Sequence, residues 1–148
     1  MVPASSLKAR GAKPRAAKTR VLFVCIGNSC RSQMAEGFAR KYGADVLTPF
    51  SAGLMPAVGV AALTHQVMGE KNIRLDGQFP KDLRIFVSEA FDVAVNMSGI
   101  PIPEMAPRQI DWIVEDPIGK RPEVYRSVVN QIEDLVMRLI LELRSAPV

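Results

Sequence analysis

The hydrophobic positions of the chain change their spacing at about residue 30. Residues 21–24, Val-Leu-Phe-Val, form a continuous apolar run, which is typical of a strand buried on both faces of a parallel sheet. Beyond Arg31 the apolar residues recur at helical spacing and polar residues occupy the other positions, so a helix is predicted from about Ser32. A strand, a short loop and a helix therefore follow one another.

The rest of the chain repeats this alternation. Apolar runs predict further strands at residues 45–50, 92–95 and 111–114, and a helix is predicted at 58–68. Segment 82–90 is ambiguous, and we expect it to contain a short helix. The last helix has the clearest pattern, because its apolar residues are four, three and four apart: Val128, Ile132, Leu135 and Leu139.

Strands that alternate with helices indicate a parallel sheet with helices on both faces. We therefore predict an α/β fold, in which residues 20–148 form a single three-layer domain with a doubly wound, four-stranded parallel sheet. In such open sheets ligands bind beyond the carboxyl ends of strands, and both Cys25 and Asp116 follow a predicted strand. The two side chains are expected to face one pocket.

The loop after the first strand carries the candidate chemistry. It begins at Cys25 and reaches Arg31 at the start of the helix. Its backbone N–H groups and the positive end of the helix dipole favour a bound dianion and the thiolate form of Cys25. The planar fork of Arg31 suits two phosphate oxygens, and the Ser32 hydroxyl is placed to donate to the Cys25 sulfur. Cys25 is thus the predicted nucleophile of a phosphate cradle formed by Ile26, Gly27, Asn28, Ser29, Cys30, Arg31 and Ser32.

This loop, Cys-Ile-Gly-Asn-Ser-Cys-Arg-Ser at residues 25–32, resembles the C-x5-R-S signature of the low-molecular-weight protein tyrosine phosphatases. The thioredoxin-coupled arsenate reductases share that signature. Residues 51–53 resemble the family's Ser-Ala-Gly segment, and residues 115–117 resemble its Asp-Pro acid loop. The resemblance implies that Asp116 protonates the leaving group and later accepts a proton from water. It also implies that catalysis requires no metal and no cofactor, because backbone amides and Arg31 stabilise the charge.

The resemblance implies a cysteine-dependent phosphatase that hydrolyses a phosphate monoester through a phosphocysteine intermediate. A phosphorylated protein or a small phosphate monoester is the expected partner, with phosphotyrosine as one candidate. Members directed at phosphotyrosine carry aromatic residues beside the Asp-Pro motif and after the Ser-Ala-Gly segment. Here those places hold Ile118 with Gly119 and Leu54 with Met55, which offer no aromatic ring to stack on a phenyl group.

Two other functions stay open. Gln33 stands where phosphatases commonly have proline, and this part of the loop resembles the arsenate reductases more. Those reductases relay oxidation through two further cysteines, which residues 96–100 lack, so arsenate reduction would need an external thiol. A non-catalytic protein that holds phosphate, sulfate or arsenate is the other alternative. Plain core thiols at Cys25 and Cys30, and a helix-capping role for Asp116, also remain open.

Charge separates the chain into two parts. The formal net charge is +4, but six of the 19 basic residues lie in the first 20 positions, which leaves 13 basic against 15 acidic residues. We therefore predict a disordered basic tail at residues 1–19 and a mildly acidic domain without a nucleic-acid footprint. The tail lacks acids, as a mitochondrial transit peptide does, but a solvated extension is favoured.

Other compositional limits concern location and metals. No run approaches the roughly 18 apolar residues of a membrane span, so no membrane partner is expected. The two cysteines lie five residues apart in one loop, which does not suit a disulfide-stapled secreted protein and favours a reducing cytoplasm. One histidine and two cysteines fall short of the four ligands of a typical zinc site, so no metal site is expected.

Overall fold

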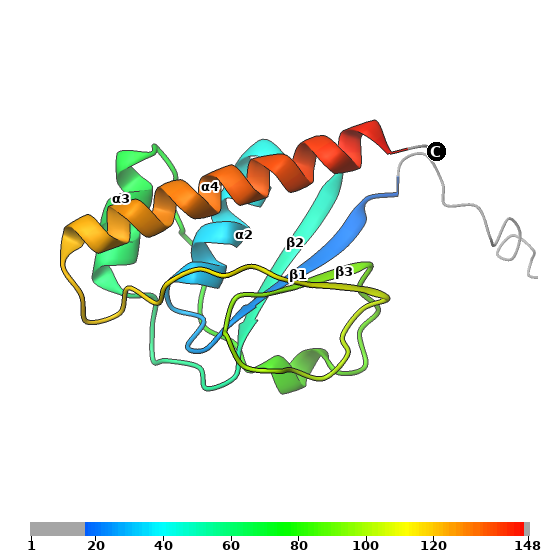
Figure 1. Cartoon of the computed structure of the whole chain (residues 1–148), viewed down its shortest axis with the longest axis horizontal. Helices are drawn as coiled ribbons and strands as arrows, with labels where there is room; N and C mark the ends of the chain where they lie inside the picture. Colours follow the sequence, from blue (N-terminus) through cyan, green and yellow to red (C-terminus); the bar gives the residue numbers. More distant parts are fainter. Residues whose placement is uncertain (1–16, 147–148) are drawn as a thin grey trace, which may run out of the picture.

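A computed structural model describes residues 17–146, which form a parallel sheet covered on both faces (Figure 1). The strands lie in the order β2, β1, β3, β4, and all three neighbouring pairs are parallel. The predicted α/β architecture is confirmed. The bounds of the strands are β1 Thr19–Cys25, β2 Leu47–Gly53, β3 Val93–Asn96 and β4 Arg108–Asp111.

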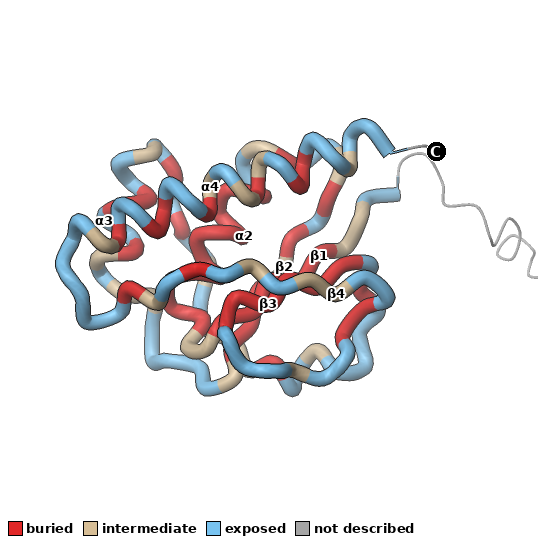
Figure 2. Tube along the Cα trace, viewed as in Figure 1, coloured by how far each residue is buried: buried red, intermediate tan, exposed pale blue. Residues whose placement is uncertain are grey.

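Three helices cover one face of the sheet: α2 (Arg31–Tyr42), α3 (Ala62–Glu70) and α4 (Pro122–Ser145). Figure 2 shows their buried residues turned toward the strands. Phe23 of β1 and Phe38 of α2 are fully buried, and burial of such a side chain stabilises the fold by about 1.5–3 kcal/mol. The periodicity predicted for α4 is confirmed, because Val128, Ile132 and Leu139 are buried in this cluster.

The opposite face is covered by less regular structure. The 3-10 helix η1 (Leu83–Phe86) and the connection between β3 and β4 pack there, and η1 lies below the sheet in Figure 1. Phe50, Phe86 and Phe91 meet edge to face, with ring centroids 5.3 to 5.9 Å apart. The short helix expected in segment 82–90 is therefore this single 3-10 turn, and the three-layer arrangement is retained.

The fourth strand differs from its predicted range. It is formed by Arg108–Asp111 and not by residues 111–114. Pairing decides this, because β3 ends at Asn96, whose partner in the register is Asp111. The apolar residues that suggested a strand, Trp112 to Val114, instead continue past the sheet toward the loop at Cys25.

Two other elements, α3 and β2, differ from their predicted bounds because of local hydrogen bonds and strand pairing. The helix predicted at 58–68 begins only at Ala62, because the preceding residues bond to the cysteine loop: the Ala57 and Ala61 N–H groups donate to the carbonyls of Gly27 and Ser29. The strand predicted at 45–50 is shifted to Leu47–Gly53, since its last three residues pair with the end of β1.

The predicted tail lies almost entirely outside the described residues, which begin at position 17, and β1 begins at Thr19. The prediction of a disordered tail at residues 1–19 therefore stays a prediction. Among residues 17–146, no helix is long and apolar enough to cross a membrane.

Candidate active site

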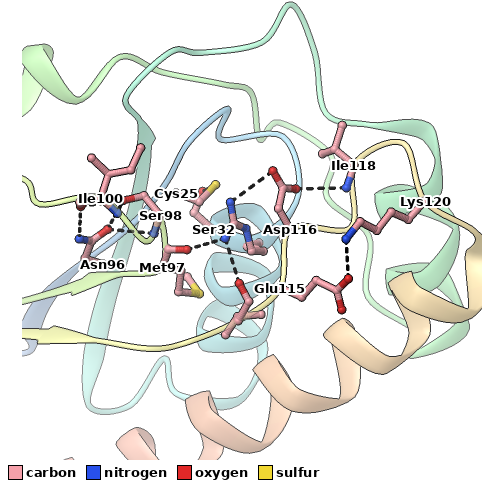
Figure 3. Close-up of polar contacts among 12 residues, drawn as sticks. Cys25, Ser32, Asn96, Met97, Ser98, Ile100, Glu115, Asp116, Ile118 and Lys120 are labelled. Atoms are coloured by element: carbon pink, nitrogen blue, oxygen red, sulfur yellow. Dashed lines mark hydrogen bonds and ion pairs between the residues drawn. The ribbon is translucent and has the colours of Figure 1, made fainter.

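Cys25 is the last residue of β1, and the loop of residues 26–30 leads from it into α2 (Figure 3). The Cys25 Sγ lies 2.9 Å from the Ser32 Oγ, the contact predicted from the sequence. Both side chains are buried. The thiol therefore has one fixed polar side-chain neighbour at the start of the helix.

The direction of that contact follows from Asn28. Its Oδ1 accepts the Lys81 backbone N–H at 2.8 Å, so its Nδ2 must be the atom that donates to the Ser32 Oγ, at 2.6 Å. Because the Ser32 oxygen already accepts from Asn28, its single proton is free to point at the Cys25 sulfur. Ser32 is thus oriented to stabilise negative charge on that sulfur.

The backbone around Asn28 explains two residue choices. Asn28 has φ of 49°, a left-handed conformation that asparagine tolerates better than most residues. Gly53 of β2 lies directly against this turn, and a Cβ atom there would come within 2.7 Å of the Ile26 carbonyl oxygen and 2.8 Å of the Asn28 nitrogen. Only glycine permits this close approach of β2 to the loop.

Glutamines support the same turn from behind. The Gln33 Nε2 donates to the Asn28 carbonyl at 2.9 Å, and the Gln78 Nε2 donates to the Gln33 Oε1 at 2.7 Å. Gln33 and Asn28 are fully buried. The side chains beneath the loop therefore hold its shape, while other loop residues line the pocket at Cys25.

Arg31 is held by two backbone carbonyls from distant segments. Its Nη1 donates to the Met97 oxygen at 2.5 Å and to the Val114 oxygen at 3.0 Å. Its Nη2 lies 3.5 Å from the Asp116 Oδ2, and only 5% of the Arg31 side chain is exposed. The guanidinium plane is thus fixed beside the loop, as bidentate oxyanion binding requires.

A tight turn at residues 96–100 fixes one of these carbonyls. The Asn96 Oδ1 accepts from the Ser98 backbone N–H at 2.9 Å and from its hydroxyl at 2.7 Å, and the Asn96 Nδ2 donates to the Ile100 carbonyl at 2.8 Å. Gly99 has φ of +79°, which favours glycine. Sequence reasoning missed this turn as a support of the site, because its contribution to Arg31 is a backbone oxygen.

Asp116 faces the loop from the segment after β4. Its Oδ1 accepts the Ile118 N–H at 3.1 Å, and 42% of its side chain is exposed. Helix α4 begins at Pro122 with Arg121 as its N-cap, so Asp116 does not cap that helix. The carboxyl group lies between solvent and Arg31, where it can exchange protons with a bound group.

One pocket of about 190 Å³ joins these groups. Asn28 and Ser32 are absent from its lining and support it from beneath, whereas the other five predicted cradle residues all line it. The lining also includes Ala57 and Ile118, which were not predicted as cradle residues. The full lining is Cys25, Ile26, Gly27, Ser29, Cys30, Arg31, Ala57, Asp116 and Ile118.

The second cysteine has a different environment. Burial raises the pKa of the Cys30 thiol to about 12, although a hydrogen bond with Thr64 acts in the opposite direction. Cys30 is therefore a neutral thiol at physiological pH and a weak nucleophile. Both cysteines are free, and among residues 17–146 no group of three or more His, Cys, Asp or Glu side chains could hold a metal ion.

Comparisons with known proteins agree on one family. The sequence profile described as low molecular weight phosphotyrosine protein phosphatase matches residues 20–147. A glutaredoxin arsenate reductase of Synechocystis sp. is 37% identical over 129 residues, which cover 84% of this chain and 98% of that protein.

Solved structures give the same result. An arsenate reductase in the phosphate-binding state superposes with a TM-score of 0.79 at 35% identity, over 84% of this chain and 98% of that one. An arginine phosphatase from Geobacillus stearothermophilus has a TM-score of 0.76 at 26% identity, over 86% and 94% of the two chains.

Proposed function

This chain belongs to the low molecular weight phosphotyrosine protein phosphatase family, and from that premise we propose that it hydrolyses a phosphate monoester through a phosphocysteine on Cys25. One observation carries the proposal: Cys25, Arg31 and Asp116 line the same pocket of about 190 Å³. A nucleophile, a fixed cation and a partly exposed carboxyl group thereby meet within reach of one bound phosphoryl group.

In the first half-reaction the Cys25 thiolate attacks phosphorus, and the bond from phosphorus to the ester oxygen breaks. Asp116 gives its proton to the departing oxygen, which leaves as an alcohol or phenol. The loop N–H groups and Arg31 bind the equatorial oxygens, where charge develops in the transition state.

In the second half-reaction a water molecule attacks the phosphocysteine. Asp116, now a carboxylate, accepts the water proton, and the sulfur leaves as a thiolate that receives the Ser32 hydrogen bond. Inorganic phosphate is released, and Asp116 is protonated again for the next cycle. One carboxyl group thus serves as acid and base.

The test uses an aryl phosphate and the Cys25→Ser variant. The wild-type protein should release phosphate with turnover, whereas Cys25→Ser should release none and should still bind vanadate or phosphate, because the loop amides and Arg31 remain. Turnover by the wild type would also remove the non-catalytic alternative. Release of phosphate by Cys25→Ser at the wild-type rate would contradict the mechanism.

A second candidate is arsenate reduction with an external thiol, and the 37% identical glutaredoxin arsenate reductase favours it. Cys25 would displace water from arsenate to form a sulfur–arsenic bond. An external thiol would then attack the Cys25 sulfur, so that As(V) leaves as arsenite with the electron pair and a mixed disulfide forms. A second thiol would reduce that disulfide, and two thiols are oxidised for each arsenate reduced.

The cysteine content of the chain limits this alternative to an external thiol. The chain contains only two cysteines, both at residues 25–30, so the two further cysteines that relay oxidation in the thioredoxin-coupled reductases have no counterpart here. Consumption of two thiols per arsenate, without hydrolysis of any phosphate ester, would favour the reductase. We also propose that the protein works in a reducing cytoplasm, because its two cysteines lie five residues apart in one loop and do not suit a disulfide-stapled secreted protein.

A further inference from the structure

A larger hollow adjoins the pocket of about 190 Å³ at Cys25, which we call the oxyanion pocket. It has a volume of about 610 Å³ and lies between the turn at residues 97–101 and the segment 111–114. It shares Ile26, Arg31 and Asp116 with the oxyanion pocket. Hollows of this size are typical of ligand sites, and the shared residues make it continuous with the reacting centre.

The lining of this hollow is mainly apolar. Trp112 packs against Phe23, with ring centroids 5.9 Å apart, and forms a firm wall. Ile100 and Ile113 stand at the two sides with 48% and 92% of their surfaces exposed. Two exposed isoleucines that face one hollow beside a reactive site indicate a surface that binds an apolar group.

The charged residues that line the hollow also limit which groups it can bind. Its charged residues are Asp111, Asp116 and Arg31, and Arg31 already pairs with Asp116 at 3.5 Å. The lining is therefore negative by one charge when both carboxyl groups are ionised. An acidic group is disfavoured there, and an apolar or basic one is accepted.

The position of the hollow suits a chain that passes through the site. Figure 3 shows Ile100 and Ile118 on opposite sides of Cys25, and Ile118 lines the oxyanion pocket while Ile100 lines the hollow. A phosphorylated residue within a peptide has neighbours on both sides, each about 3.3 Å further along an extended chain. One of these neighbours would lie over the hollow.

We propose that the hollow between residues 97–101 and 111–114 is a subsite for an apolar side chain that flanks the phosphorylated residue of a peptide substrate. The proposal rests on the phosphatase function proposed above and names its substrate class, a phosphorylated protein. Ile100, Ile113 and Trp112 hold the flanking side chain, and Asp111 disfavours an acidic one.

The experiment measures kcat/KM for phosphotyrosine peptides. Leu, Ser or Glu is placed in turn at each of the two residues before the phosphotyrosine and each of the two residues after it. At one position or more, the wild type should prefer Leu over Ser by about five- to tenfold, in keeping with the burial of part of a leucine side chain. Glu should be the poorest of the three residues. Ile113→Ser should abolish this preference and leave hydrolysis of an aryl phosphate unchanged.

Ile85→Ser is the matched control, because Ile85 is an isoleucine of η1 with 59% exposure and lines neither pocket. It should retain the wild-type preference. Equal kcat/KM for all flanking residues, or a preference that survives both Ile113→Ser and Ile100→Ser, would overturn the subsite. So would a loss in Ile113→Ser confined to thiol-dependent arsenate reduction, which would assign the hollow to a thiol protein.

A binding measurement keeps this result separate from the proposed function. The dissociation constants of the same peptides are measured with Cys25→Ser protein, which needs no turnover. Tighter binding of the Leu peptide than of the Ser and Glu peptides would support the subsite. If the wild-type protein hydrolyses no phosphate ester in the kinetic experiment, that binding result would still support the subsite, and the absence of hydrolysis would contradict the phosphatase proposal. Equal binding of the Leu, Ser and Glu peptides would contradict the subsite whatever the activity.

Discussion

The two walls of the site are built in opposite ways. One wall is the cysteine loop, eight consecutive residues whose supporting side chains, Asn28 and Ser32, are fully buried. The other wall brings together residues 96–100 and 112–118 from separate segments, and it includes the exposed Ile113 and Ile118. Under the proposed function, the cysteine loop (the local wall) would bind the phosphoryl group common to all substrates. Residues 96–100 and 112–118 (the assembled wall) would meet the part of the substrate that varies.

This difference predicts how substitutions in each wall affect the hydrolysis of different substrates. A change in the cysteine loop should affect all phosphate esters by a similar factor, because every substrate presents the same phosphoryl oxygens. A change in the assembled wall should have an effect that depends on the leaving group or on the peptide. Arg31 joins the two walls, since it begins α2 and binds the carbonyls of Met97 and Val114.

The largest loss of kcat/KM is expected for Arg31→Lys. A single ammonium group cannot hold the Met97 and Val114 carbonyls and also bind two phosphate oxygens, so kcat/KM should fall by about 10³ to 10⁵ for every ester. Arg138→Lys on the exposed face of α4 is the control and should be unaffected. Loss of less than about tenfold would mean that the loop amides alone bind the transition state.

Asp116→Asn tests the assembled wall. The kcat/KM of esters of high leaving-group pKa should fall by about 10² to 10⁴ and that of activated aryl esters much less, because kcat/KM reports the first step, in which only the former need a proton. Rates across a series of substituted phenyl phosphates measure this as a steeper dependence on leaving-group pKa.

Glu115→Gln is the matched control for that series. Glu115 pairs with Lys120 at 2.5 Å and lines neither pocket, so its variant should keep the wild-type slope. An unchanged slope in Asp116→Asn together with a steeper one in Glu115→Gln would move the acid role to Glu115.

Ser32→Ala tests the local wall with a smaller change. It removes the hydrogen bond to the Cys25 sulfur and leaves the Asn28 Nδ2 without its partner, so kcat should fall by about tenfold to a hundredfold. The factor should be nearly constant across the phenyl phosphate series. If Ser32→Ala also made the rate depend more steeply on leaving-group pKa, as expected for Asp116→Asn, the proposed difference between the two walls would be wrong.

The smallest effect on activity is expected for Cys30→Ser, whose consequence lies in oxidation. We expect peroxide to convert Cys25 to a sulfenic acid and the Cys30 thiol to condense with it, which would release water and form a disulfide that a reductant reopens. Cys30→Ser should keep most activity but fail to recover after peroxide and reductant. Equal recovery of the variant and the wild type would refute the protective role.

The raised pKa of Cys30 adds a pH dependence to this protection. Because the pKa is about 12, the thiolate fraction of Cys30 rises roughly tenfold for each pH unit across the neutral range. Formation of the disulfide after brief peroxide treatment should therefore accelerate with pH. A rate independent of pH between pH 6 and 9, roughly the span in which the protein can be assayed, would contradict attack by the Cys30 thiolate.

The same two walls explain what could be predicted from sequence. The local wall follows chain order, so the strand, Cys25, Arg31 and the helix that begins there could be predicted from adjacent residues. The assembled wall depends on tertiary contacts. Apolar Trp112 to Val114 resemble a strand, but their partner strand ends at Asn96, and they line the hollow instead.

The support of Arg31 was also beyond sequence reasoning. Its partners are the carbonyls of Met97 and Val114, and a backbone oxygen is common to all residues, so it leaves no compositional signal. The polar turn at Asn96, Ser98 and Gly99 was the available indication, because these residues favour turns. Its meaning emerges only once β3 lies beside β1 in the sheet.

The central claim is that Cys25 carries the phosphoryl group between two half-reactions, and rapid-quench kinetics test it most directly. Asp116→Asn protein mixed with an activated aryl phosphate should release a burst of phenol equal to the enzyme concentration, because loss of the base slows the water step more than the first step. Mass spectrometry of the quenched protein should find the phosphoryl group on Cys25. Release of phenol without a burst, in protein that turns over with no phosphoryl group on Cys25, would contradict the account.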